Sequence, residues 1–290
     1  MRCFQLCEIM RRYGSDKFHY ETMPIPNLRH DILRGAWAAT RPKEAFYIFV
    51  KDAIDRLDET ALERLHERAS AVLHDPIDRK LTLTPRHFVD VHIASSYTQK
   101  LILEKLINSE NLTGRIDLLL HQADIRLQKN MTLPEKEFTP AYFGDPNNGF
   151  LPDQVRNRIS IYNVALTKGM QKNIQHFTDA NFHYAVRPHI QTHNSDVIKP
   201  LTKAIIAARC GAPVLVNRAA HDAEMLLGPN YPYFVDRTDE ASVLCILDQA
   251  KDDFQGPRWK AALDAMQALE MRVNPVQTAL ELEQILERSL

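Results

Sequence analysis

The sequence predicts an α/β protein built from two layered halves and a helical C-terminus. From about residue 44 onward, short apolar runs alternate with amphipathic stretches of helical period. Strands that are separated by helices pair in parallel, because the chain must cross back before the next strand begins. A polar, proline-containing stretch at 129–139 separates the first set of strands and helices from a second. Residues 239–290 follow a helical pattern almost throughout.

The first half is expected to cover residues 44–130, after an N-terminal extension over residues 1–43. Its strands are expected where β-branched and aromatic residues cluster, at 45–50, 71–74, 89–94 and 116–120. Two helices are expected to begin at capping-box patterns, Thr60-x-x-Glu63 and Ser96-x-x-Gln99. In such a pattern the first side chain accepts a hydrogen bond from a backbone N–H that the first helical turn leaves unpaired.

The second half is expected to cover residues 131–290. Its strands are expected at 141–144, 159–164, 182–186 and 214–216. A short helix is expected to begin at Pro152, and a longer one to run from Ile198 to Cys210. Further helices are expected after Asp239, with stops at Gly256-Pro257 and at Pro275.

The composition excludes several classes of protein. Apolar residues make up 44% of the chain and charged residues 25%, which is typical of a soluble protein with a core. The 36 Lys and Arg residues against 37 Asp and Glu leave no basic excess, so no nucleic-acid partner is expected. No apolar run approaches the roughly 18 to 20 residues that cross a bilayer, and the first residues lack the apolar segment of a secretory signal. We expect a cytoplasmic protein, with peripheral attachment at the inner membrane face as the alternative.

Glycine is scarce, at 9 of 290 residues. The sequence contains no G-x-G-x-x-G, no G-x-x-x-x-G-K-[ST] and no G-x-S-x-G pattern. A standard dinucleotide fold, a P-loop and an α/β-hydrolase elbow therefore lack their signatures. The cysteines form no C-x-x-C pair, which favours reduced thiols over a disulfide or a zinc site: they are Cys3, Cys7, Cys210 and Cys245.

The expected helix from Ile198 to Cys210 begins with an unusual set of charges. Ser195 or Asp196 can cap it, and Gly211 can end it. Lys199 and Lys203 are four residues apart in its first turn, on one face, and Thr202 lies beside them. Cations at the positive end of the helix dipole are unfavourable, which suggests a compensating anion. Two ammonium groups and a hydroxyl suit a diphosphate, and the alternative is that both lysines are solvated.

These residues resemble a known family. The run Lys199-Pro-x-Thr-Lys203, an Ala-rich helix, Gly211-x-Pro213, a strand and Asn217-Arg218 is similar to the donor-site helix of GT-B glycosyltransferases, particularly bacterial family 4-like members. The resemblance implies two Rossmann-like domains that face a cleft, with the acceptor on the first half and a nucleotide sugar on the second. Arg187 is expected as a further anion contact. Together, the expected donor-binding residues are Gly144, Arg187, Lys199, Thr202, Lys203, Asn217, Arg218 and Asp222.

Two departures from the family pattern are visible. Many members carry a Glu five residues before the glycine of the Gly-x-Pro element, where it holds the nucleotide ribose, but Ile206 stands there in this sequence. The first half is also short for an acceptor domain. Catalysis would need a base for the acceptor hydroxyl. His121 and Asp124 are candidates for that base because they follow a strand, where open α/β sheets place their ligand crevice.

The sequence therefore predicts a glycosyltransferase that moves a sugar from a nucleotide-diphosphate sugar to the hydroxyl of a glycan, a lipid-linked acceptor or a small molecule. The sequence contains no Asp-x-Asp motif, and the histidines of the 183–193 segment have no carboxylate pair to complete a metal site. No cofactor and no metal are therefore expected. A non-catalytic binding or assembly protein on the same scaffold is the main alternative, and an epimerase is a third. The amphipathic helix at 276–290 is expected to pack on the first half, with a homodimer contact as the alternative.

Overall fold

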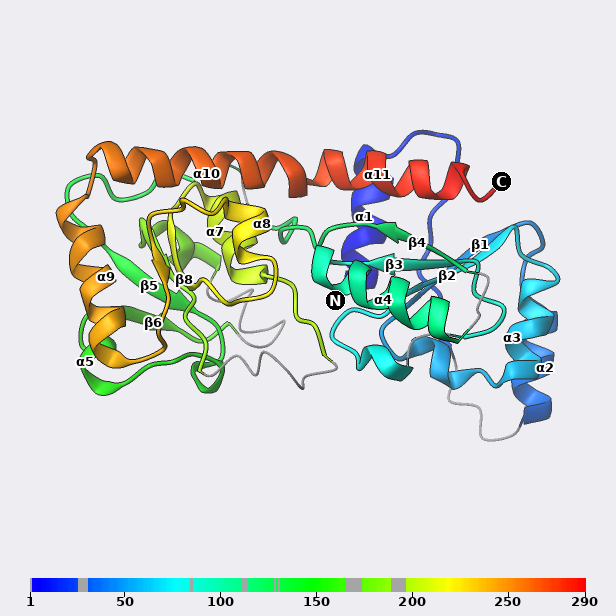
Figure 1. The fold of residues 1–290 in the computed structure, drawn as a ribbon. Coiled ribbons are helices and arrows are strands. Elements are labelled where there is room, and N and C mark those ends of the chain that lie inside the picture. Colours follow the sequence, from blue (N-terminus) through cyan, green and yellow to red (C-terminus); the bar gives the residue numbers. More distant parts are fainter. Residues whose placement is uncertain are drawn as a thin grey trace. The chain divides into compact units, whose positions relative to one another are not determined.

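The computed structural model describes residues 2–25, 31–83, 86–110, 114–127, 129, 131–164, 174–188 and 197–290 (Figure 1). The chain forms two compact units. Unit 1 comprises Met1–His121, Asn194–Pro200 and Pro275–Leu290, and unit 2 comprises Gln122–His193 and Leu201–Asn274. The first division therefore falls after His121, whereas the sequence analysis places it after residue 130. The N-terminal 43 residues and the last helix both belong to unit 1.

A parallel sheet forms the centre of unit 1, as the alternation of strands and helices predicts. Its strand order is β1-β2-β3-β4, and every neighbouring pair is parallel. The strands are β1 (Phe46–Val50), β2 (Ala71–Asp75), β3 (Val91–Ala94) and β4 (Arg115–Leu118). β2 and β3 are buried along their whole length, which explains their continuous apolar character. All four strands lie within about two residues of the predicted positions.

The helices of unit 1 include two that the sequence analysis does not predict, α1 and α2. α1 buries Leu6, Ile9 and Met10, whose spacing is that of one helix face, and it packs against α11. α4 packs on β3 and β4, and α2 packs on α3 (Figure 1). The helical elements are α1 (Arg2–Tyr13), α2 (Asp31–Ala39), η1 (Ala53–Arg56), α3 (Glu59–His66), η2 (Leu81–Leu83), α4 (Tyr97–Ser109) and α11 (Pro275–Glu287).

One of the two predicted helix caps is confirmed and the other is wrong. Ser96 caps α4, because its hydroxyl accepts a hydrogen bond from the Gln99 backbone N–H at 3.1 Å. α3 is capped by Asp58 rather than Thr60, with the Asp58 carboxylate accepting from the Ala61 N–H at 2.8 Å. Asp and Thr both cap helices well, so the earlier of two capping residues can begin the helix two residues sooner.

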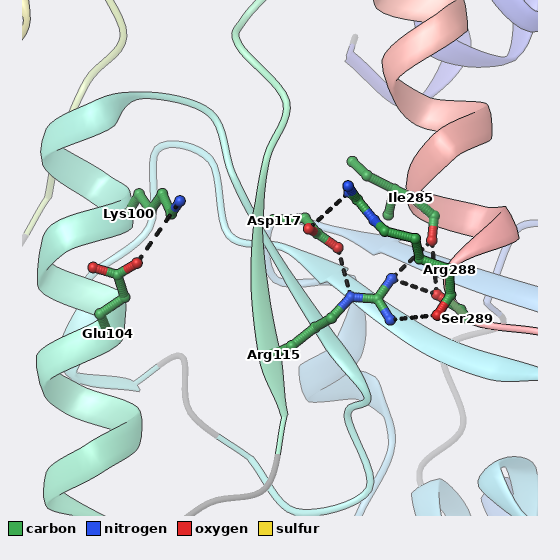
Figure 2. A network of polar contacts seen from close by, with 7 residues as sticks. All are labelled: Lys100, Glu104, Arg115, Asp117, Ile285, Arg288 and Ser289. Carbon is green, nitrogen blue, oxygen red and sulfur yellow. Dashed lines mark hydrogen bonds and ion pairs between the residues drawn. The ribbon is translucent and has the colours of Figure 1, made fainter.

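The C-terminal turn of α11 is anchored on β4 by one arginine (Figure 2). The Arg115 guanidinium donates to the Ile285 carbonyl at 2.8 Å, to the Arg288 carbonyl at 2.9 Å and to the Ser289 hydroxyl at 2.7 Å. Asp117 accepts from Arg115 at 2.7 Å and from Arg288 at 2.9 Å. The last carbonyls of a helix lack partners within the helix, so this network satisfies groups at the negative end of α11.

Replacing Arg115 by alanine should lower the free energy of unfolding by about 1–2 kcal/mol, because several carbonyl and carboxylate contacts are lost together. Urea unfolding measures this change. Lys100→Ala is the matched control, since Lys100 makes an exposed pair with Glu104 at 3.8 Å. Such a pair contributes about 0–0.5 kcal/mol. Equal losses in the two variants would show that the network does not stabilise α11.

Unit 2 also contains a parallel sheet, with strand order β6-β5-β7-β8-β9. Its strands are β5 (Pro140–Phe143), β6 (Ser160–Tyr162), β7 (Phe182–Tyr184), β8 (Val214–Asn217) and β9 (Phe234–Val235). The first four match the predicted positions, and β9 is an additional short strand at the edge. Large aromatic side chains that are less than 2% exposed form much of the core, including Tyr142, Phe177, Phe182, Tyr184 and Tyr233.

Proline and glycine mark helix ends in unit 2, and the start of α11 in unit 1, where the sequence predicts them. α10 begins at Pro257, α11 begins at Pro275, and Gly211 ends α7 in the left-handed conformation with φ of 80°. The Asp239 carboxylate caps α9 by accepting from the Ser242 N–H at 2.8 Å. The helical elements are η3 (Pro146–Asn148), α5 (Asp153–Arg156), η4 (Ile174–Thr178), α7 (Thr202–Cys210), α8 (Ala223–Leu227), α9 (Glu240–Asp252) and α10 (Pro257–Val273).

The start of α7 differs from the prediction. The helix begins at Thr202 rather than at Ile198, and Lys199 is an exposed residue ahead of it. The cause is Pro200, which disfavours the helical conformation for the residue that precedes it. The prediction that Lys199 and Lys203 share one helix face is therefore wrong. Ser195 and Asp196, the expected caps, lie outside the described residues.

No helix within the described ranges is both long and apolar enough to pass through a lipid bilayer.

Candidate functional site

Several predicted donor residues meet at one edge of the unit 2 sheet. Gly144 follows β5, Arg187 follows β7, and Asn217 is the last residue of β8. β5, β7 and β8 are neighbours in a parallel sheet, so their carboxyl ends lie at the same edge, where open α/β sheets bind ligands. Lys203 from the first turn of α7 reaches the same edge, as its contacts with Tyr142 and Gly144 show. We call Tyr142, Gly144, Arg187, Lys203 and Asn217 the unit 2 site.

Lys203 and Gly144 are in immediate contact. A Cβ atom added to Gly144 would lie 2.8 Å from the Lys203 Nζ and 3.1 Å from the Tyr142 hydroxyl oxygen. Glycine at this position therefore leaves the space that the ammonium group occupies. The same ammonium lies 4.8 Å from the centroid of the Tyr142 ring, within the range of a cation–π interaction.

The first turn of α7 adds backbone donors to this edge. Thr202 is the first helical residue and is half-buried, and Lys203 follows it. The Leu201 carbonyl accepts the first bonds of the helix, from the Ala204 N–H at 3.0 Å and the Ile205 N–H at 3.1 Å. The N–H groups ahead of Ala204 have no acceptor within the helix and lie at the positive end of its dipole. The helix start and the Lys203 ammonium together favour an anion.

Asn217 holds the backbone of Arg187. Its side-chain oxygen accepts from the Arg187 N–H at 2.8 Å, and its amide nitrogen donates to the Arg187 carbonyl at 3.3 Å and to the Thr238 hydroxyl at 2.8 Å. Asn217 is only 2% exposed. These bonds fix where the Arg187 backbone leaves the sheet, and the donor contact of Asn217 stays a prediction.

Arg218 is held by acidic side chains. Its guanidinium donates to Asp236 at 2.6 Å and to Glu224 at 2.8 Å, and it lies 4.6 Å from the centroid of the Phe234 ring. The hydrogen bonds to Glu224 and Asp236 raise the pKa of Arg218 above its ordinary value. These contacts tie α8 to the end of β9. The predicted donor role of Arg218 would require it to exchange them for the ligand.

The residues after β8 carry backbone strain. Asp222 is 6% exposed and adopts the left-handed conformation with φ of 62°. A non-glycine residue in this conformation costs on the order of 1 kcal/mol and is enriched at functional sites. Its neighbour His221 is half-buried, and burial lowers the pKa of His221, with Asp222 raising it and Arg187 lowering it further. His221 therefore lies within electrostatic reach of both Asp222 and Arg187.

Sequence reasoning missed His221 and Tyr142. Burial raises the pKa of Tyr142 to about 12, with Asp145 adding to the rise and Arg187 opposing it. The phenol is therefore neutral at physiological pH. The signal for His221 is available in the sequence, because it directly precedes the candidate Asp222. No local pattern distinguishes Tyr142 from the other apolar residues of its strand.

The two candidate bases belong to different units. His121 is the last residue of unit 1 and is half-buried, with its backbone N–H donating to the Ser95 carbonyl at 3.1 Å. Asp124 belongs to unit 2 and is 8% exposed. Its two carboxylate oxygens accept from the Arg126 guanidinium at 2.9 Å and 2.6 Å. Asp124 would have to leave this pair to act as a base.

The histidines of the 183–193 segment form no metal cluster in the described part of the chain. His183 is buried and its ring lies 4.9 Å from that of Phe143, which places it in the core of unit 2. His189 and His193 lie outside the described residues. Across the ranges that the structure describes, no three His, Cys, Asp or Glu side chains are grouped so that they could hold a metal ion.

Comparison with known proteins identifies the fold. No family model and no curated protein matches the sequence. Among solved structures, the GtfA/B complex is similar at a TM-score of 0.58 and 9% identity, over 89% of this chain and 60% of that one. Anabaena HepE in complex with UDP is similar at a TM-score of 0.55 and 14% identity, over 89% and 81%. Accessory secretory protein 1, 2 and 3 of Streptococcus pneumoniae is similar at a TM-score of 0.53 and 13% identity, over 89% and 57%.

The protein therefore has the fold of the GT-B glycosyltransferases, with parallel α/β sheets and a helical C-terminus, as the sequence predicts. At identities of 9% to 14% the likeness defines the fold alone. The chain spans 57% and 60% of the lengths of the accessory secretory protein and GtfA/B structures.

Proposed function

We propose that the protein is a glycosyltransferase that uses a nucleotide-diphosphate sugar, with the diphosphate bound at the unit 2 site. The observation that carries the proposal is the Lys203 ammonium held beside Gly144, at the start of α7 and at the carboxyl edge of a parallel sheet. A helix start, a glycine that admits close approach and a cation are what a diphosphate needs. The UDP bound to the HepE structure supports the same class of ligand.

In this proposal the residues of unit 2 act on the leaving group. Negative charge develops on the nucleoside diphosphate as the sugar bond breaks. Lys203 and the first turn of α7 offset that charge without a metal ion. Arg187, whose backbone is held by Asn217, contributes a second cation in this proposal. His121 serves the acceptor by removing the proton of the attacking hydroxyl. Lys199 and Arg218 remain predicted donor contacts of lower weight, since Lys199 precedes the helix and Arg218 is paired.

A non-catalytic protein on the same scaffold is the second candidate. Ile206, which replaces the ribose-binding Glu of many family members, packs against the apolar cluster that contains Phe143, Phe177 and Cys210. That position therefore serves the core rather than a sugar hydroxyl. The likeness to an accessory secretory protein favours the same alternative. The non-catalytic alternative predicts that the protein binds a stable protein partner and transfers no sugar from any donor.

Replacing Lys203 by alanine should weaken donor binding by about 1.5–3 kcal/mol, the contribution of a charge-assisted hydrogen bond. This corresponds to roughly a 10- to 150-fold rise in Kd. The measurement is a thermal-shift panel of UDP-, GDP-, dTDP- and ADP-sugars, because a ligand that binds only the folded state raises Tm. Lys260→Ala is the control, since Lys260 is an exposed lysine on α10.

A rise in Tm with the sugars of one nucleotide, lost in Lys203→Ala and kept in Lys260→Ala, would support the donor site. It would also identify the nucleobase of the donor. A shift of equal size in both variants would remove Lys203 from the site. No shift with any donor would favour the non-catalytic alternative.

A further inference from the structure

We propose that Tyr142 is a positioning residue, whose ring face holds the Lys203 ammonium beside Gly144. The inference rests on the proposed donor site and adds a residue to it that no sequence motif assigns. Tyr142 would not touch the ligand, because its side chain is fully buried. It would act through Lys203 by deciding where the positive charge lies before the diphosphate arrives.

The contacts of Lys203 show how the ammonium is placed. Its Nζ atom lies 4.8 Å from the centroid of the Tyr142 ring and 2.8 Å from the position that a Gly144 Cβ would occupy. Ring and glycine therefore lie on the same short stretch of β5 and the turn after it. Lys203 extends from α7 to this stretch, where it meets Tyr142, a residue 61 positions earlier in the chain.

The Tyr142 ring is itself fixed from several sides. Its hydroxyl donates to the Asp145 carbonyl at 2.7 Å. A Cβ on Gly149 would lie 2.9 Å from the ring, so the backbone of that glycine packs directly against it. The Tyr184 ring meets it edge-on at 6.3 Å between centroids. A ring held in this way offers a fixed surface, which a flexible apolar side chain would not.

An aromatic face suits this task better than a carboxylate. The ring attracts an ammonium ion through its quadrupole but carries no net charge that would cancel the charge of the lysine. The ring therefore does not itself reduce the attraction of the ammonium for an anion. Holding the long lysine side chain near its bound position also reduces the entropy that binding must remove.

The position of the ammonium can be measured without any ligand. Reductive methylation with ¹³C-formaldehyde places methyl groups on each lysine and preserves the positive charge. We expect the Lys203 signal, assigned with Lys203→Arg, to be shifted upfield by the ring current of Tyr142. The shift should persist in Tyr142→Phe, which keeps the ring, and disappear in Tyr142→Leu. The exposed Lys251 and Lys260 provide the unshifted reference.

The consequence for binding is measured by calorimetry with UDP, and with inorganic pyrophosphate as a probe independent of the nucleoside. Tyr142→Leu should raise Kd about 5- to 10-fold, the effect of losing a partly buried cation–π contact. Tyr142→Phe should restore binding to within about 2-fold of wild type, since the ring face is retained. Urea unfolding of each variant identifies any loss that comes from instability alone.

The outcomes separate this inference from the proposed function. An unshifted Lys203 signal in the wild type would overturn the positioning role, whatever the ligand binding shows. Unchanged affinity in Tyr142→Leu, with binding lost in Lys203→Ala, would overturn it as well and leave the proposed donor site intact. If neither UDP nor pyrophosphate binds the wild type, the donor site fails, and the methyl signal still decides whether Tyr142 places the ammonium.

Discussion

Acidification from pH 7 to pH 5 is expected to lower the free energy of unfolding by about 2 kcal/mol for each of three buried histidines, His74, His92 and His183. All three are at most 3% exposed. Burial lowers the pKa of His74 to about 4, although the Lys51 carbonyl and Asp75 oppose the change. Burial lowers the pKa of His92 and of His183 to about 3, and His74 adds to the effect on His92.

The direction follows from the difference between the folded and unfolded states. A histidine of the unfolded chain has a pKa near 6.5 and binds a proton at pH 5, whereas the buried imidazole stays neutral. The unfolded state therefore gains protons first. The stability that the neutral rings contribute is present above pH 6.5 and is lost as the pH falls from about 6.5 toward 4 for His74 and toward 3 for His92 and His183. Urea unfolding at pH 7, 6 and 5 measures the loss.

His92 allows a direct test of this pH dependence. Among the residues that the structure describes, neither of its ring nitrogens has a hydrogen-bond partner, so replacing it by leucine removes a titrating group without breaking a described hydrogen bond. His92→Leu should reduce the loss between pH 7 and pH 5 by about 2 kcal/mol. The exposed His19, replaced by glutamine, should leave the loss unchanged. The same loss in His92→Leu as in the wild type would show that this histidine is not the source.

Replacing Arg2 by methionine is expected to lower the free energy of unfolding by about 3–5 kcal/mol. The Arg2 guanidinium forms an ion pair with Asp75 at the end of β2 and donates to the Leu119 carbonyl at 2.9 Å. The two charged side chains are 2% and 0% exposed. The substitution would leave the Asp75 carboxylate buried without its cation, which costs far more than the pair contributes.

A matched control lies on the same helix. Arg12 pairs with Glu8 at 2.6 Å on the exposed side of α1, and Arg12→Met should cost no more than about 0.5 kcal/mol. The double variant Arg2→Met/Asp75→Leu removes both charges and should recover part of the stability lost in Arg2→Met. If Arg2→Met loses no more than Arg12→Met in urea unfolding, the buried pair does not hold α1 on the sheet.

Only part of the candidate site could be predicted from the sequence. Lys203, Gly144, Arg187 and Asn217 are all identified individually, because glycine turns, strand ends and helix starts have local signatures. The sequence does not predict that Asn217 holds the Arg187 backbone, because this contact joins the ends of two strands that are neighbours only in the folded sheet. The predicted helix start at Ile198 is wrong, because Pro200 delays the start of α7 to Thr202.

The assignments that failed depend on contacts between distant segments. The sequence analysis assigns α1 and α2 to an N-terminal extension, but Leu6, Ile9 and Met10 of α1 are buried in unit 1. The boundary between the units also differs, because the first division falls after His121 and Asn194–Pro200 returns to unit 1. The return of the last helix to unit 1 agrees with the expectation that it packs on the first half. No composition shift marks the return of Asn194–Pro200 to unit 1.

By itself the sequence determined the α/β class, the strand positions, the parallel pairing and the helix ends at Pro257, Pro275 and Gly211, because these follow from burial periodicity and backbone sterics within a few residues. The tertiary structure alone decided which partners the charged side chains have. Asp124 and Arg218 are held by partners, and Tyr142 lies under the Lys203 ammonium. Such pairings depend on strand order and helix packing, which bring together side chains that the sequence leaves far apart.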